Sequence, residues 1–128
     1  MNWLAIGLGT LAFFAVGALW YGPLFSKVWQ REAGITERPQ GPAIARAMGL
    51  TLLAEFVVVL ALGHMFAFLQ PGDHAKMMIA TGFGLAIMAP AIGIGYVHQR
   101  KSLLLFAIDA GYFIVGMAVV GLVFVALG

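Results

Sequence analysis

The stretch that decides the fold is LLLFAIDAGYFIVGMAVVGLVFVAL, residues 103–127, in which Asp109 is the one charged side chain. The hydrocarbon core of a bilayer is about 30 Å thick, and a helix crosses it with about 20 apolar residues at ~1.5 Å each. This run is long enough. Because lipid offers no hydrogen bonds to exposed backbone groups, it predicts a transmembrane helix.

Three further segments have the same apolar character, at about 3–24, 47–69 and 77–97. The 128 residues are 62% hydrophobic and 9% charged, whereas a soluble domain is about 45–50% apolar and about 25% charged. We therefore expect an all-α, polytopic membrane protein in which four transmembrane helices form a single domain over residues 1–128.

The basic residues predict which way the helices run. The connection 25–46 carries Lys27, Arg31, Arg38 and Arg46, and 98–102 carries Arg100 and Lys101. The connection between the second and third spans carries Lys76 alone, and both termini lack Lys and Arg. Since Lys and Arg in short loops mark the cytoplasmic side, both termini are expected to be extracytoplasmic and the loop 25–46 cytoplasmic.

At the cytoplasmic end of the first span lie Trp20, Tyr21, Gly22 and Pro23, followed by Lys27 and Trp29. Trp and Tyr favour the membrane–water interface, and proline disfavours helix at the residue before it and removes a backbone donor. These residues are therefore expected to act as an interfacial anchor and a helix stop. The alternative is that the aromatic side chains belong to a site.

Two carboxyl groups lie inside predicted spans, Glu55 and Asp109. A carboxylate at the bilayer centre costs at least about 2.5–3.5 kcal/mol, so such residues usually face a bundle interior or a wet cavity. Both lie roughly 10–14 Å from the cytoplasmic ends of their helices. At similar depth we expect a polar pocket made of Trp20, Tyr21, Thr51, Glu55, Tyr96, Asp109 and Tyr112. The alternative is that protonated carboxyls hold the helices together through hydrogen bonds.

A second group of residues, on the opposite side, has the chemistry of soft-metal ligands: His64, Met65, His74, Met77 and Met78. Imidazole and thioether together suit Cu(I). The chain has no cysteine, the methionines show no M-x-x-M repeat, and methionine is a common packing residue in apolar helices. We expect packing here, and neither a metal nor another cofactor.

The most specific motifs are Trp20-Tyr21-Gly22-Pro23-Leu24-Phe25 with Lys27 and Trp29, and Gly111-Tyr112 in the last span. From Asn2 through the four spans, the chain resembles the bacterial integral membrane family called domain of unknown function 1761. The resemblance implies a compact, multi-pass four-helix protein of the bacterial cytoplasmic (inner) membrane, and it implies no reaction. Where an asparagine is expected in that family, this chain carries Asp109, an ionisable group.

Pairs of small residues such as Ala5/Gly9, Gly82/Ala86 and Ala107/Gly111 let membrane helices approach closely. They exceed what one bundle needs, so the expected partners are lipid and either a second copy or other membrane helices, not nucleic acid. Three functions remain open: a homo-oligomeric small-solute or ion transporter or channel, an accessory subunit of a membrane complex, and a membrane enzyme. The enzyme comes last because no nucleophile–base pair or cofactor motif is present.

Overall fold

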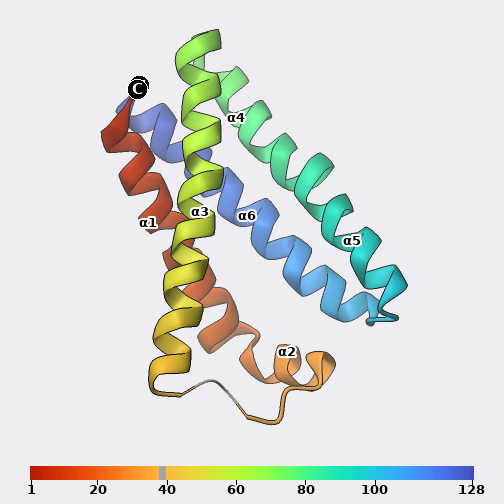
Figure 1. Cartoon of the computed structure of the whole chain (residues 1–128). Helices are drawn as coiled ribbons and strands as arrows, with labels where there is room; N and C mark the ends of the chain where they lie inside the picture. The colour runs from red at the N-terminus through yellow and green to blue at the C-terminus, as the bar shows by residue number, and fades with distance from the viewer. Residues whose placement is uncertain (38–39) are drawn as a thin grey trace.

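A computed structural model describes residues 1–37 and 40–128 of the chain. Arg38 and Pro39, counted above with the first connection, lie outside the described residues. The described part is all-α, and four of its helical stretches are long and apolar enough to cross a membrane: Trp3–Leu24, Pro42–Leu69, Asp73–His98 and Leu103–Leu127. Figure 1 shows these stretches alternating in direction along the chain.

The spans are built from regular helix and two π-helical segments. The elements in chain order are α1 (Trp3–Leu19), η1 (Trp20–Leu24), α2 (Ser26–Ala33), α3 (Pro42–Leu69), α4 (Asp73–Gly82), η2 (Phe83–Met88), α5 (Ala89–His98) and α6 (Leu103–Leu127). The second span begins at Pro42 and the third at Asp73, earlier than the apolar runs that start at 47 and 77. Pro42 suits the first turn of α3, whose N–H groups have no partner inside the helix, and Asp73 favours the first turn of α4 through the helix dipole.

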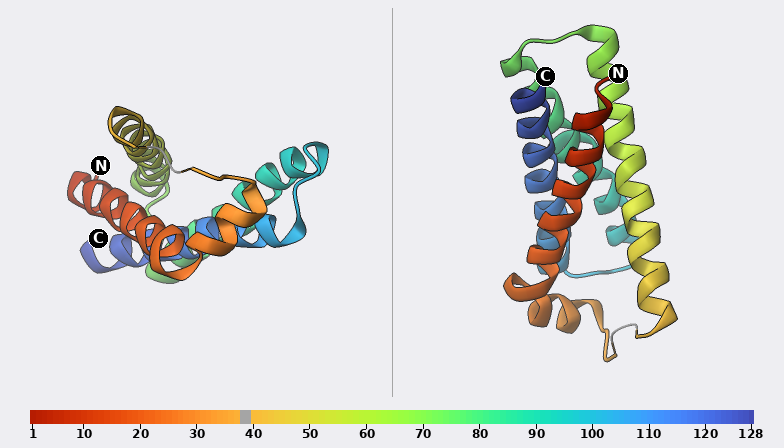
Figure 2. Two further views of the ribbon diagram at one scale, coloured as in Figure 1. Left: turned by 90° about the horizontal axis from the view of Figure 1, so that it is seen from below. Right: turned by 90° about the vertical axis from the view of Figure 1, so that its left-hand side faces the viewer.

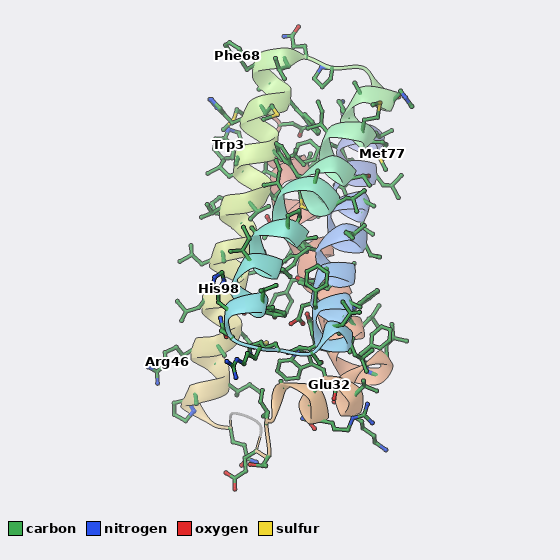
Figure 3. The ribbon with its side chains drawn as sticks, turned by 90° about the vertical axis from the view of Figure 1, so that its right-hand side faces the viewer. Trp3, Glu32, Arg46, Phe68, Met77 and His98 are labelled. Carbon is green, nitrogen blue, oxygen red and sulfur yellow. The ribbon has the colours of Figure 1, made fainter. Side chains whose placement is uncertain are left out.

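The two ends of the bundle differ in what they carry. Both termini and the connection between α3 and α4 lie at one end, here called the terminal end, and the opposite end, the α2 end, carries α2 and the turn before α6 (Figure 2). The Asn2 side-chain amide donates to the Leu127 carbonyl at 3.1 Å, which joins the two termini. Glu32 and Arg46 mark the α2 end, and Phe68 and Met77 the terminal end (Figure 3).

The first span ends at Leu24, as expected, although its last turn, which contains Gly22 and Pro23, is not α-helical. Instead, Trp20–Leu24 form a π turn in which the Phe25 N–H donates to the Trp20 carbonyl at 2.9 Å. Pro23 has no N–H for an α-type bond, and a wider turn carries the backbone past it. The helix then ends at Phe25, and α2 follows as a separate short helix that ends at Gly34 with φ 72°.

Pro90 produces the second π segment. It cannot donate to a carbonyl one turn earlier, and the preceding η2 has a π-type bond from the Ala89 N–H to the Gly84 carbonyl. At Gly84 the third span lies directly on α6, because a Cβ there would stand 2.8 Å from the Phe113 carbonyl oxygen. The distortion at Pro90 therefore takes the form of a π segment that packs against α6.

The core lies along α6, which packs against α1 on one side and against α4, η2 and α5 on the other. Its central side chains are large and apolar: Ile6, Phe13, Val59, Leu62, Met117, Val120 and Phe124. At Gly116 the α6 backbone meets the Phe13 ring, since a Cβ there would lie 2.6 Å from it. Small residues thus bring the helices of the body together, as is usual in membranes.

Helix α3 is attached to this body by one half. Toward the terminal end, Val59, Leu62 and Phe66 are buried, and the Phe66 ring meets Phe124 of α6 edge-on with centroids 5.1 Å apart. From Pro42 to Ala54 the residues of α3 are exposed, except Ala47, which is half-buried. The α2-end half of α3 therefore stands away from the body, and the site described below lies beside it.

Candidate functional site

A cleft of about 670 Å³ lies between the free half of α3 and the body. Its lining runs from Trp29 and Ile44 near the α2 end to Phe14, Glu55 and Tyr112 deeper in the bundle. Ile44 and Glu55 are 11 residues apart on α3, which is about 16 Å of helix. The volume falls within the range of about 300–1,000 Å³ typical of small-molecule sites.

Asp109 of α6 lies at one side of the cleft, 7% exposed, and accepts two phenol hydrogen bonds. The Tyr21 hydroxyl donates to its Oδ1 at 2.5 Å, and the Tyr96 hydroxyl donates to its Oδ2. An ionised carboxylate is an acceptor only, and both of its oxygens are used here. Three spans therefore meet at one carboxyl group.

Glu55 of α3 is also buried, with 5% of its surface exposed. Among the described residues, one of its two carboxyl oxygens has a hydrogen-bond partner and the other has none. The Tyr112 hydroxyl donates to Glu55 Oε2 and lies 3.4 Å from the Phe13 carbonyl. Glu55 Oε1 is buried and has no hydrogen-bond partner among the described residues. Glu55 lines the cleft, and an unsatisfied buried oxygen costs about 1–3 kcal/mol, so a further group is needed at this residue.

The two carboxyl groups are joined through aromatic rings. Tyr21, which holds Asp109, meets the ring of Tyr112, which holds Glu55, edge-on with centroids 5.4 Å apart. Tyr21 also meets Trp29 of α2 at 5.5 Å. We call Tyr21, Glu55, Tyr96, Asp109 and Tyr112 the carboxyl–tyrosine cluster. All four spans contribute to it, so a movement of one helix affects the surroundings of both carboxyl groups.

The π turn η1 places two consecutive aromatic side chains on different neighbours. Tyr21 enters the cleft, whereas the Trp20 indole N–H donates to the Ile108 carbonyl of α6 at 2.8 Å. A Cβ at Gly111 would lie 3.0 Å from the Trp20 ring, so Trp20 fills the space that this glycine leaves. Six of the seven residues expected in the pocket line the cleft, and Trp20 instead fixes η1 to α6.

Three residues predicted from the sequence line the cleft without belonging to the carboxyl–tyrosine cluster. Thr51 lines the cleft, but its hydroxyl donates to the Ala47 carbonyl of its own helix at 2.8 Å and not to Glu55. Gly22 and Trp29, expected as anchors, also line it. The residues that the sequence reasoning missed are apolar: Phe14, Gly17, Ala18, Ile44, Ala47, Met48, Ile92 and Phe113. No sequence signal separates such residues from lipid-facing ones.

The histidines and methionines toward the terminal end come from two helices, α3 and α4. In the described ranges, no three His, Cys, Asp or Glu side chains lie close enough together to hold an ion. His64 and His74 are exposed. Met77 packs on α6, where a Cβ at Gly121 would lie 3.1 Å from its sulfur. Met65 and Met78 belong to α3 and α4, half-buried and exposed respectively.

Four apolar helices long enough to cross a bilayer, with a carboxyl–tyrosine cluster buried among them, define a small multi-pass membrane protein. The chain belongs to the family described as Protein of unknown function (DUF1761), which it matches over residues 4–125. This confirms the resemblance carried by the Trp20–Phe25 motif and by Gly111-Tyr112. No curated protein and no solved structure matches the chain.

Proposed function

We propose that this protein is a small-solute carrier of the bacterial cytoplasmic membrane, and that its solute binds in the cleft beside α3. The observation that carries the proposal is that Glu55 lines a cavity of about 670 Å³ and that its buried Oε1 has no partner among the described residues. Purely structural carboxyls would be expected to have both oxygens bonded, as Asp109 has.

The attachment of α3 supports movement of a solute. One half of α3 is buried on the body and the other half is exposed along the cleft. Tilting of a helix held at one end changes the width of the cleft without breaking the core. Such rigid-body movements of packed helices are a common way in which membrane carriers open and close a site.

The basic residues support an orientation in which the α2 end faces the cytoplasm. Near that end lie Lys27, Arg31, Arg46, Arg100 and Lys101, and Lys76 lies toward the terminal end. By the positive-inside rule the cleft then opens toward the cytoplasmic leaflet, and both termini are extracytoplasmic. A solute would enter from the cytoplasm or from the inner leaflet.

Transport can be tested without knowing the solute. Proteoliposomes are incubated with a bacterial metabolite extract, and their contents are compared with those of empty liposomes by mass spectrometry. We expect at least one solute to enter with the wild-type chain and to be excluded by Ala47→Trp, which fills the cleft. Ala54→Trp, an exposed position of the same helix outside the lining, is the matched control. Identical contents in all vesicles would refute carrier function.

A second candidate is an accessory subunit of a larger membrane protein complex, in which small-residue faces dock to the helices of a different partner. Gly7 of α1 and Gly49 of α3 face open space, since a Cβ at either would meet nothing within 4 Å. Both line a shallow groove of about 510 Å³ between the two helices, on a different face from the cleft. Small residues at a lipid-facing groove favour the close approach of another helix. This proposal is tested by the mass of the purified protein, as described below.

A further inference from the structure

We infer that the solute is a lipophilic amine, bound as its ammonium with the nitrogen at Glu55 and its apolar body along the aromatic wall of the cleft. The inference rests on the proposed function and adds the chemical class of the ligand.

The charge of the cleft is one-sided. Its lining contains two carboxyl groups, Glu55 and Asp109, and none of the lining residues in the described chain is Lys, Arg or His. An ionised carboxylate out of water is costly unless a cation or hydrogen-bond donors compensate it. Asp109 has two phenol donors, and Glu55 has one. The compensation still missing is therefore at Glu55.

The missing group is a donor, and an ammonium N–H supplies it. An ammonium beside Glu55 favours the ionised carboxyl, in which Oε1 is an acceptor and Tyr112 already donates to Oε2. An ammonium would give Oε1 its hydrogen bond and Glu55 its counter-charge in a single contact. An anionic ligand would meet no cationic side chain among the described lining residues and would be repelled by both carboxyls.

The walls select an organic cation over an inorganic one. Apart from the two carboxyls, the lining is mostly aromatic and aliphatic, including Phe14, Tyr21, Trp29 and Phe113. A bare metal ion needs several oxygen ligands, and the described residues contain no group of three or more His, Cys, Asp or Glu that would hold one. Aromatic faces attract ammonium groups, and an apolar body gains from leaving water.

The Tyr96 ring of the cluster already has a cationic side chain over it. The Lys101 Nζ lies 5.5 Å from the centroid of the Tyr96 ring, within the distance at which cation–π attraction acts. The hydroxyl of the same tyrosine donates to Asp109. The Tyr96 ring therefore attracts a positive charge while its hydroxyl holds Asp109.

The test uses the full-length chain in phosphatidylcholine nanodiscs and two fluorescent probes of nearly equal shape. Dansylcadaverine carries a primary ammonium, and its N-acetyl derivative is neutral. Binding is followed by energy transfer from tryptophan to dansyl, with the signal of the probe in lipid subtracted; Trp29 lines the cleft. A hydrogen bond to a charged group contributes about 1.5–3 kcal/mol, so we expect the ammonium probe to bind about tenfold tighter or more.

Substitutions then test whether Glu55 causes the preference for the ammonium probe. Glu55→Gln should reduce the ratio of the two affinities to near one, and Glu37→Gln, at an exposed carboxyl in the first connection, should leave it unchanged. Equal affinities in the wild-type protein, or a ratio that survives Glu55→Gln, would overturn the amine inference and leave the cleft as a solute site. The wild-type comparison alone decides the matter if Glu55→Gln does not fold.

A different outcome would refute the proposed function itself. If Ala47→Trp lowers the affinity of neither probe, or if the wild-type chain binds neither, then the cleft does not take small apolar solutes. If both probes bind equally and Ala47→Trp displaces both, the cleft remains a solute site and the ammonium specificity is wrong. The two failures are thus separable in one experiment.

Discussion

Removing the Tyr21 hydroxyl should destabilise the bundle by an amount that depends on the charge of Asp109. Tyr21→Phe keeps the ring and its contacts with Trp29 and Tyr112, and deletes the 2.5 Å hydrogen bond to Asp109. A hydrogen bond to a charged group contributes about 1.5–3 kcal/mol, and one between neutral groups about 0.5–1.5 kcal/mol. In the Asp109→Asn background the acceptor is neutral, so the same substitution should cost less.

The double-mutant cycle therefore has an expected coupling energy of about 1–1.5 kcal/mol, the difference between these two ranges. The assay is SDS-driven unfolding in mixed micelles, followed by circular dichroism, for the wild-type chain, both single variants and the double variant. A second cycle with Tyr96→Phe in place of Tyr21→Phe should also show coupling, because Tyr96 donates to the other oxygen of Asp109.

Thr10→Val with Asp109→Asn is the control cycle. Thr10 is buried and donates to the Ile6 carbonyl of its own helix at 2.8 Å, and it lies 11 residues before Tyr21, about 16 Å along the helix. These two changes should be additive within about 0.3–0.5 kcal/mol. If the Tyr21 cycle is equally additive, then Tyr21 does not stabilise a charged Asp109, and the Trp20–Pro23 motif returns to the role of a membrane anchor.

Three further outcomes are expected. Gly84→Ala should destabilise the fold by about 1–3 kcal/mol in the same unfolding assay, since its Cβ would stand 2.8 Å from the Phe113 carbonyl oxygen. Gly82→Ala is the control, because a Cβ there meets nothing within 4 Å. Equal losses of stability in the two variants would contradict the packing of the third span on α6. In intact bacteria, a single cysteine at Asp73 should react with an impermeant thiol reagent and one at Gln99 should not, both sites being exposed; the reverse pattern would invert the proposed orientation. The purified protein should have a mass of at least twice 13.6 kDa by light scattering corrected for detergent, and a monomer at all concentrations would refute homo-oligomerisation.

The sequence by itself determined the membrane character and the number of spans. Hydropathy is a local property, because each residue of a span such as 103–127 must be compatible with lipid or a packed interior whatever its neighbours are. The depth of Glu55 and Asp109 also follows from the chain, since each residue advances a helix by a fixed rise. The family followed from the Trp20–Phe25 motif and Gly111-Tyr112, and the match over residues 4–125 confirms it.

Tertiary structure alone decided which polar groups meet. Trp20 and Tyr21 are adjacent and equally polar in sequence, yet one donates to the Ile108 carbonyl and the other to Asp109. Adjacent residues of a helix project about 100° apart, and the neighbour that each of these side chains meets depends on how η1 packs against α6. Rotation about a helix axis is set by contacts with other helices, and it is not encoded in the depth of a residue.

The cleft also belongs to tertiary structure. In a chain that is 62% hydrophobic, residues such as Ile92 and Met48, which line the cleft, look the same as Ile94 and Leu50, which are exposed on the helix surface. Lipid and protein interior are both apolar, so no hydrophobic periodicity distinguishes the two faces of a membrane helix. The packing of one half of α3 on α1 and α6, with the other half left free, is what creates the cavity.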